Sequence, residues 1–352
     1  NSHITISGGT VTGNSSRRYA GGIVFSYTSA NVSNLTVSNN VLLSTSTESW
    51  HVAGIYATKS TINMTNCTIT GNVSQATNNA DDAGAIWIYN YSNLTLDNCY
   101  IAENTSVKGV GGILTKSTLL IKNCVVSANQ GVYGGLFYHQ NNHDVNEYIQ
   151  NCTIQDNIGT KAGAIYVQTS NINLTLTDTA ITDNVGPYAI TYYASTSYTI
   201  NFKVGGATKI CNNKTAGNVE SNFLLNYSHT IAVISPLTTD ARIGVTRDTT
   251  GRLTVGYGVH NSTDDPATHF FSDVTTSVVE EMQVEISGGG TQKEANLISL
   301  TPANQWETAV KNSLANNGNQ YTAVLYRDWN ADSSGFFGKL TDCYSSGALN
   351  VP

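Results

Sequence analysis

The amino-acid sequence predicts an all-β fold, a right-handed parallel β-helix of about seven to eight coils. One observation is a segment of the form apolar-x-apolar-x-x-small-x-(Ile/Val)-x-x-Asn, which recurs at intervals of 25 to 32 residues. A second is a three-residue motif that lies between successive segments. It consists of a small residue, then Gly or Ala, then an apolar residue, as in Gly111-Gly112-Ile113. A third is period-two alternation in runs of three to five residues, broken by Gly, Asn and Asp, which predicts three short strands per repeat. The repeats end at Asn14, Asn40, Asn72, Asn104, Asn129, Asn157, Asn184 and Asn213.

A leucine-rich repeat would have a similar period, but its L-x-x-L-x-L frame and its helical half are missing. In a β-helix each coil pairs with the next at about 4.8 Å. Leu94, Leu96, Cys99 and Ile101 are then expected to point inward, together with their equivalents in other coils.

The cysteines are expected to be part of this core. None of the six lies in a C-x-x-C pair, which argues against a zinc ribbon. We favour a stack of small apolar side chains over a metal or redox ladder, and oxidation of some adjacent pairs stays open. The residues expected in this column are Gly9, Leu35, Cys67, Cys99, Cys124, Cys152 and Thr179.

The terminal Asn of each repeat is expected to form an amide ladder at one corner. Stacked amides satisfy one another, and Asn tolerates the left-handed conformation of tight turns. Beyond the coils of residues 1–222, the longer strands without the coil period predict a β-rich capping region over residues 223–300. Residues 301–352 are predicted to form a helix, with Trp306, Val310 and Leu314 on one face, followed by strands.

Composition excludes several classes of partner. Only 12% of the 352 residues are charged, the net charge is −7, and Arg17-Arg18 is the sole basic cluster. This predicts no nucleic-acid binding. There is no run of 18 apolar residues, so we expect no membrane insertion of this segment.

The Gly-Gly-Ile and terminal-Asn repeats resemble the β-helical passenger domains of bacterial surface proteins, including chlamydial polymorphic outer-membrane proteins. Two C-terminal segments, Ser235-Pro-Leu-Thr-Thr-Asp-Ala-Arg-Ile-Gly-Val-Thr and Phe270-Phe-Ser-Asp, look like the closing region of large β-helix repeat proteins from gut-type Firmicutes. Asp328-Trp329-Asn-Ala-Asp and Gly347-Ala-Leu-Asn-Val-Pro352 look like the segment that precedes the first coil in those proteins. The resemblance implies an extracellular or cell-surface role in adhesion or structure, and it implies no enzyme activity.

Candidate catalytic and metal-binding residues are sparse. Asp81-Asp82 is the only acidic pair in the coils, and we interpret it as part of a solvated loop. His139 and His143 form the only close histidine pair and are also interpreted as loop residues. We therefore expect no catalytic residue, metal or cofactor. A polysaccharide-active enzyme, lyase or glycosidase, and a glycan-binding module stay open as alternatives, and tyrosines near corners could stack on sugars. Those tyrosines are Tyr91, Tyr133, Tyr188, Tyr192 and Tyr193.

Fourteen Asn-x-Ser/Thr sequons make glycosylation a candidate modification. Sequon asparagines in the ladder column are expected to be less available; these are Asn14, Asn72, Asn104 and Asn213. The candidate acceptors are Asn63, Asn66, Asn93, Asn151, Asn173, Asn226 and Asn261.

The sharpest expectation is self-association. We expect one copy to be followed head-to-tail by another, either as separate chains in a fibril or as periods of a tandem array. The helix and strands of residues 301–352 would then cover the first coil of the next copy. The residues expected at this interface are Ile4, Ile6, Val11, Trp306, Val310, Leu314 and Val351. Other expected partners are glycans and host or cell surfaces.

Overall fold

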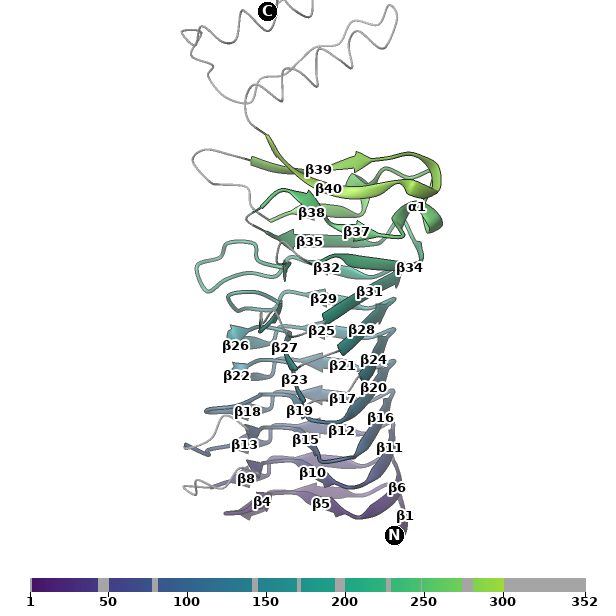
Figure 1. Ribbon diagram of the computed structural model, residues 1–352. Coiled ribbons are helices and arrows are strands. Elements are labelled where there is room, and N and C mark those ends of the chain that lie inside the picture. The colour runs from purple at the N-terminus through teal and green to yellow at the C-terminus, as the bar shows by residue number, and fades with distance from the viewer. Residues whose placement is uncertain are drawn as a thin grey trace, which may run out of the picture. The chain divides into compact units, whose positions relative to one another are not determined.

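The computed structural model describes residues 2–43, 51–77, 82–140, 145–169, 172–193, 200–225, 229–247, 249–273 and 281–300. The chain divides into two compact units, residues 1–274 with 284–297 and residues 275–283 with 298–352. The first unit is a parallel β-solenoid, and Figure 1 shows its coils stacked in sequence order. This confirms the predicted all-β parallel fold.

Sheet A forms one face of the solenoid and contains ten strands, all paired in parallel. The eight Asn-ended repeats contribute its first eight strands. In stacking order the strands are β1 (Ser2–Ser7), β6 (Thr28–Ser33), β11 (Thr61–Thr65), β16 (Asn93–Asp97), β20 (Thr118–Lys122), β24 (Val145–Gln150), β28 (Ile172–Thr177), β31 (Ile200–Gly206), β34 (Ile231–Leu237) and β37 (Thr254–Val255).

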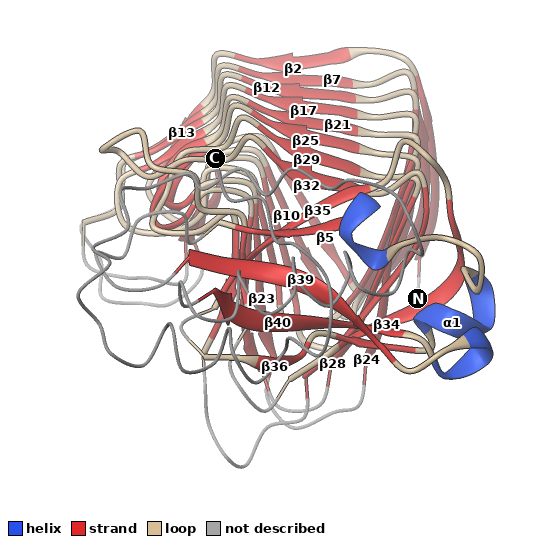
Figure 2. Ribbon diagram, turned by 90° about the horizontal axis from the view of Figure 1, so that it is seen from above, coloured by secondary structure: helices blue, strands red, loops and turns tan. Residues whose placement is uncertain are grey.

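Two further parallel ladders make an 18-stranded sheet that is joined through one strand, β35. Seen from above, the strands of the first ladder lie directly over one another (Figure 2). The first ladder is β2 (Thr10–Thr12), β7 (Thr36–Ser38), β12 (Thr68–Thr70), β17 (Tyr100–Ala102), β21 (Val125–Ser127), β25 (Thr153–Gln155), β29 (Ala180–Thr182), β32 (Lys209–Cys211), β35 (Arg242–Thr246) and β38 (Phe270–Ser272). The second is β5 (Ile23–Ser26), β10 (Ile55–Thr58), β15 (Ile86–Tyr89), β19 (Ile113–Thr115), β23 (Leu136–Gln140), β27 (Ile165–Thr169), β30 (Ile190–Tyr192) and β33 (Phe223–Leu224).

Between these two ladders the described residues of the coils form short strands that pair in parallel with those of neighbouring coils, and we call this part of the coils the flange. The small-Gly/Ala-apolar motif lies between the flange and the second ladder. Small residues are needed there because the backbone lies close to the backbone of the next coil. A Cβ on Gly21 would lie 2.6 Å from the Ala53 carbonyl oxygen and 3.0 Å from that of Val41. The strands that follow the first ladder are β3 (Ser15–Ser16), β8 (Val41–Leu42), β13 (Val73–Ser74), β18 (Thr105–Ser106), β22 (Gln130–Tyr133) and β26 (Ile158–Ala162). The strands that precede the second ladder are β4 (Tyr19–Ala20), β9 (His51–Val52) and β14 (Asp82–Ala83), and the ends of β22 and β26 continue their row.

The predicted amide ladder is present and is the most regular feature of the solenoid. In each coil the Nδ2 of the terminal Asn donates to the Oδ1 of the next, at 2.8–3.0 Å, and its backbone N–H donates to the same oxygen. The ladder continues from Asn213 to Asn222, at 2.8 Å. From Asn40 onward these asparagines are buried, so the amide network satisfies polar groups inside the solenoid.

The left-handed residue at this corner is the one before the ladder Asn, not the Asn itself. A second left-handed corner precedes the cysteine column, which explains why an Asn so often stands before Cys. The residues at the first corner are Gly13, Asn39, Gly71, Glu103, Ala128, Asp156, Asp183 and Asn212, and those at the second are Gly8, Asn34, Asn66, Asn98, Asn123, Asn151, Asp178 and Gly206.

Two buried carboxylates close the last coils. Asp273 accepts the backbone N–H and the Nδ2 of Asn222, at 2.7 and 2.6 Å, and thereby ends the amide ladder. Glu294 accepts the Thr254 hydroxyl and the Gly256 N–H, each at 2.8 Å, beside the last strand of sheet A. Carboxylates suit these places because every neighbouring group is a donor.

The sequence predicts that the coils end near residue 222, but the parallel stacking continues beyond this residue. Strands β34, β35, β37 and β38 continue it to Ser272, because Asn222 and Asp273 extend the ladder after the repeat motif has faded. A separate sheet of β36 (Gly251–Arg252), β40 (Glu294–Leu300) and β39 (Glu281–Ser287) follows, and β36 pairs with β40 in antiparallel fashion.

Helical structure is slight within the described residues. It consists of α1 (Tyr257–His260) and two 3₁₀ turns, η1 (Pro266–Thr268) and η2 (Gly290–Gln292). The sequence does not predict α1 at this position. The predicted helix around Trp306 lies outside the described residues.

Candidate functional site

The turn that leads from the second ladder into sheet A carries a tyrosine or a lysine in four consecutive coils; the tyrosines and the first lysine are exposed, and the second lysine is half-buried. We call Tyr27, Lys59, Tyr91 and Lys116 the tyrosine–lysine column. Three of them adopt a left-handed backbone, with φ of 52° at Tyr27, 47° at Lys59 and 56° at Tyr91. Non-glycine residues adopt this conformation at an energetic cost, so the surrounding structure must hold the turns in place.

A ladder of buried serines holds the turns. The N–H of Thr28 donates to the Ser60 hydroxyl at 3.0 Å, that of Ser60 to Ser92 at 3.1 Å, and that of Ser92 to Ser117 at 3.1 Å. Each serine directly follows, in sequence, a member of the column. The serines are therefore in register at about 4.8 Å per rung. The turn of Tyr91 has one residue more than that of Lys59, and the Lys59 N–H donates to the Asn90 carbonyl at 3.0 Å.

Side chains of the column contact one another across coils. The Lys59 ammonium donates to the Tyr27 hydroxyl at 2.8 Å and lies 4.9 Å from the centre of its ring. The hydrogen bond from Lys59 to Tyr27 raises the pKa of Lys59, with a smaller contribution from Tyr91. Lys116 lies 5.9 Å from the ring of Tyr89. The exposed fraction is 56% for Tyr27 and 77% for Tyr91.

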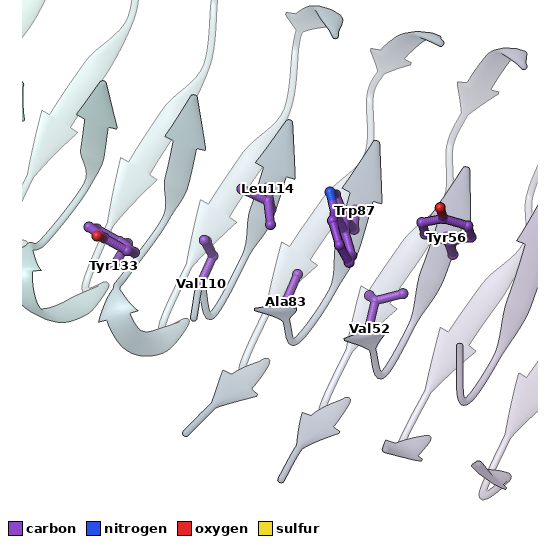
Figure 3. Packing of buried hydrophobic residues seen from close by; sticks show 7 residues of the cluster. All are labelled: Val52, Tyr56, Ala83, Trp87, Val110, Leu114 and Tyr133. Atoms are coloured by element: carbon purple, nitrogen blue, oxygen red, sulfur yellow. The ribbon is translucent and has the colours of Figure 1, made fainter. Parts of the chain in front are cut away.

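An apolar cluster forms between side chains of the second ladder and of the flange, and Figure 3 shows its seven buried residues. Tyr56 and Trp87 occupy neighbouring strands with their ring centres 5.6 Å apart, and Trp87 is 5.8 Å from Tyr89. Flange residues, including Val52 and Ala83, pack against these rings and bury them. Tyr56 and Trp87 thus support the turn and are not themselves open to a ligand.

Asp82 is buried, contrary to the expectation of a solvated loop; Asp81 lies outside the described residues. The Ser74 and Ser106 hydroxyls each donate to one carboxylate oxygen of Asp82 at 2.7 Å, which draws it inside the flange. Burial raises the pKa of Asp82 to about 7, although the two serines oppose the shift. In this arrangement Asp82 joins neighbouring coils and does not face a substrate.

Glu147 is a second buried acid, and sequence reasoning missed it. It lies on sheet A in register with Leu174, and its Oε2 accepts the Leu119 N–H at 2.7 Å. Its Oε1 has no hydrogen-bond partner among the described residues, and burial raises the pKa of Glu147 to about 9. The side chain is therefore a neutral acid at pH 7. Period-two alternation places Glu147 on the inner face, which was the available signal.

The cysteine column lies in the core as predicted, and its described members are free thiols. The Cys99 N–H donates to the Cys124 sulfur at 3.3 Å, and the Cys124 N–H to the Cys152 sulfur at 3.4 Å. The Cys152 N–H donates to the Thr179 hydroxyl in the same way. The column is thus a weak hydrogen-bond ladder; Cys343 lies outside the described residues.

We expect slow maleimide labelling of Cys67, Cys99, Cys124 and Cys152 in the native protein, because each thiol is buried and reaction requires local opening. Mass spectrometry after a short exposure should find these sites unmodified, whereas denaturation should make all of them react. Rapid native labelling of all four would contradict the inward register.

The candidate glycosylation acceptors divide by exposure. Asn63, Asn66, Asn93 and Asn151 are exposed and Asn173 is half-buried, whereas Asn226 lies outside the described residues. Asn261 differs from the expectation, since it is buried. Its amide nitrogen donates to the Leu237 carbonyl at 2.9 Å and to the Asp264 carboxylate at 2.8 Å, so it is a poor acceptor in the folded state. In the ladder column Asn72, Asn104 and Asn213 are buried, but Asn14 is exposed.

The remaining candidates are placed as follows. Tyr133 and Tyr192 are buried, Tyr188 is half-buried, and Tyr193 is exposed like Tyr91. At the expected interface Ile4 is 37% exposed, while Ile6 and Val11 are half-buried. Outside the described residues lie Trp306, Val310, Leu314, Val351, His143 and the side chain of His139.

Sequence reasoning also missed Tyr27, Lys59 and Lys116. Their common signal is a Ser or Thr that follows each of them at the same repeat position.

Within the described part of the chain, no group of three or more His, Cys, Asp or Glu side chains is placed to hold a metal ion. None of the described helices is long and apolar enough to span a membrane.

A family model described as "Right handed beta helix region" matches residues 1–205. No curated protein and no solved structure matches.

Proposed function

The chain belongs to the right-handed β-helix family, and from this premise we propose that it serves as an extracellular structural and adhesive solenoid. The observation that supports this most is the amide ladder, which links every coil from Asn14 to Asn222 and ends on Asp273. Such a ladder makes a rigid support, on which surface side chains repeat at the rung spacing. The proposal assigns no catalytic role to Asp81 or Asp82 and no cofactor to the chain.

The cell surface of a bacterium is the location that fits this proposal, by the resemblance to bacterial surface repeat proteins. The outer side of sheet A suits exposure to water because it carries short polar side chains, such as Thr61, Asn63 and Thr65. Glycosylation of the exposed sequons at Asn63, Asn66, Asn93 and Asn151 is part of the proposal.

Self-association is the structural half of the proposal. The edge of β1 offers the apolar side chain of Ile4 to a partner, and residues 301–352 of a second copy would cover it. The resulting contact is head-to-tail and does not close, so it generates fibrils or a tandem array.

Electron microscopy of the full chain at high concentration tests this half. We expect rods with a regular axial repeat, and we expect Ile4→Asp to prevent them by placing a charge in an apolar contact. Ile158→Asp, at an isoleucine in β26 that is exposed to a similar degree, is the control and should leave the rods intact. A chain that stays monomeric at high concentration would contradict the arrangement.

A further inference from the structure

We propose that the tyrosine–lysine column binds a linear acidic polysaccharide in which charged and uncharged sugars alternate. This inference rests on the proposed adhesive function and names its ligand class. The column presents Tyr27, Lys59, Tyr91 and Lys116 in consecutive coils, an alternation of aromatic and basic side chains along the solenoid axis.

The spacing fits a sugar chain. In the serine ladder Ser60 and Ser117, which follow the two lysines, are two rungs apart, as are Thr28 and Ser92, which follow the two tyrosines. Two rungs amount to about 9.6 Å. An extended chain of pyranose rings advances by a similar length for every two sugars. One sugar of each pair can then stack on a tyrosine while the next places its carboxylate or sulfate near a lysine.

The chemistry of the turn favours an anionic ligand. No Asp or Glu occurs in the four turn segments 26–28, 58–60, 89–92 and 115–117. The Lys59 ammonium has three donors, of which the Tyr27 hydroxyl takes one, and the side chain is exposed. A carboxylate can therefore reach Lys59 without breaking the contact that positions it.

The net charge of the protein also limits the charge density of the ligand. The protein carries a net charge of −7, which repels densely charged chains such as nucleic acids. A glycan with one negative charge per two sugars meets both lysines and adds less repulsion than a chain that is charged at every sugar.

The site is preorganised for binding. The serine ladder of Ser60, Ser92 and Ser117 fixes the turns, and Trp87 supports Tyr89 beneath Lys116. A ligand lying along these turns therefore needs to order few protein groups, which limits the entropic cost of binding.

Isothermal titration calorimetry with the purified full chain and short hyaluronan oligosaccharides, whose sugars alternate between acidic and neutral, tests the proposal at low salt. We expect the double variant Lys59→Gln, Lys116→Gln to weaken binding by about tenfold or more, since two charged contacts are lost. We expect Tyr91→Ala to weaken it by about tenfold. Lys59 and Tyr91 are exposed and Lys116 is half-buried, so we expect the variants to fold, and urea unfolding checks this.

Matched controls lie elsewhere on the same solenoid. Lys122→Gln removes a lysine that pairs with Asp97 at 3.0 Å on sheet A, and Tyr100→Ala removes a tyrosine exposed to 43% on another ladder. Both should leave the affinity unchanged. Equal weakening by Lys122→Gln would overturn the site, because it would indicate a general attraction of anions.

The choice of glycan tests the ligand class. Polygalacturonate, which is charged at every sugar, and uncharged cello-oligosaccharides should both bind more weakly than hyaluronan. Tighter binding of either one, or no binding of any acidic glycan, would overturn the inference. Rods that still form in electron microscopy would then show that the ligand class failed and self-association did not.

Discussion

Glu147→Gln is expected to stabilise the protein by up to about 3 kcal/mol at pH 7 and to remove most of its loss of stability at alkaline pH. The pKa of Glu147 is about 9 in the folded state, against 4.5 for the ordinary side chain. The folded chain therefore holds a proton that the unfolded chain releases, and folding becomes less favourable as the pH rises from 4.5 to 9. Below pH 4.5 this penalty is absent.

Glutamine is neutral in both states and has a similar shape. Its amide oxygen can accept the Leu119 N–H, as Glu147 does at 2.7 Å. No described residue bonds to the second oxygen, so the substitution breaks no further hydrogen bond.

Urea unfolding midpoints between pH 7 and pH 9 provide the measurement, because the loss of stability due to Asp82, whose pKa is about 7, is largely complete below this range. The wild-type midpoint should fall across this range, and that of the variant should fall much less. Glu220→Gln, at an exposed position, is the control and should follow the wild type. A variant whose midpoint falls in parallel with the wild type would show that Glu147 is not a neutral acid in the folded protein.

Asn129→Ala should destabilise the solenoid by about 3–4 kcal/mol, the second large effect. Asn129 is buried in the middle of the amide ladder. Its Oδ1 accepts the Asn104 N–H and Nδ2, at 3.1 and 3.0 Å, and its Nδ2 donates to the Ile101 carbonyl and to Asn157. Truncation leaves two donors of Asn104 and the Ile101 carbonyl without these partners, at about 1 kcal/mol or more each.

Asn129→Asp separates the effect of removing the side chain from the effect of removing only its amide N–H₂ donor. Aspartate fills the same space but cannot donate to Asn157 or Ile101, so we expect it to destabilise at least as strongly as alanine at pH 7. Asp273→Asn, at the end of the ladder, turns an amide N–H₂ toward a donor of Asn222 or Thr246, so we expect it to lose at least one hydrogen bond and to destabilise the protein.

An exposed asparagine on sheet A supplies the matched control. Asn63→Ala loses one hydrogen bond to Asn31, of 3.0 Å, and should change the stability by less than about 0.5 kcal/mol. Urea unfolding measures all four variants. If Asn129→Ala were as mild as Asn63→Ala, the ladder would not be a main source of stability.

The sequence by itself determined the fold, the number of repeats and the contents of two core columns. These features are local patterns: period-two alternation decides which side chains point inward, and identical residues at one repeat position stack when coils pair in register. The positions of Asn40 in the amide ladder and Cys99 in the thiol column therefore follow from spacing alone.

The tertiary structure decided which polar residues are buried and where the stack ends. Asp82 is drawn inward by Ser106 of the next coil, and Asp273 ends the ladder by binding Asn222, 51 residues away. Lys59 and Tyr27, which form a hydrogen bond, are likewise 32 residues apart in the sequence. Such pairings depend on how coils of unequal length superimpose, and unequal lengths shift equivalent positions in the sequence. The physical reason is that hydrogen bonds join residues by their place in the stack, and only the folded chain establishes that place.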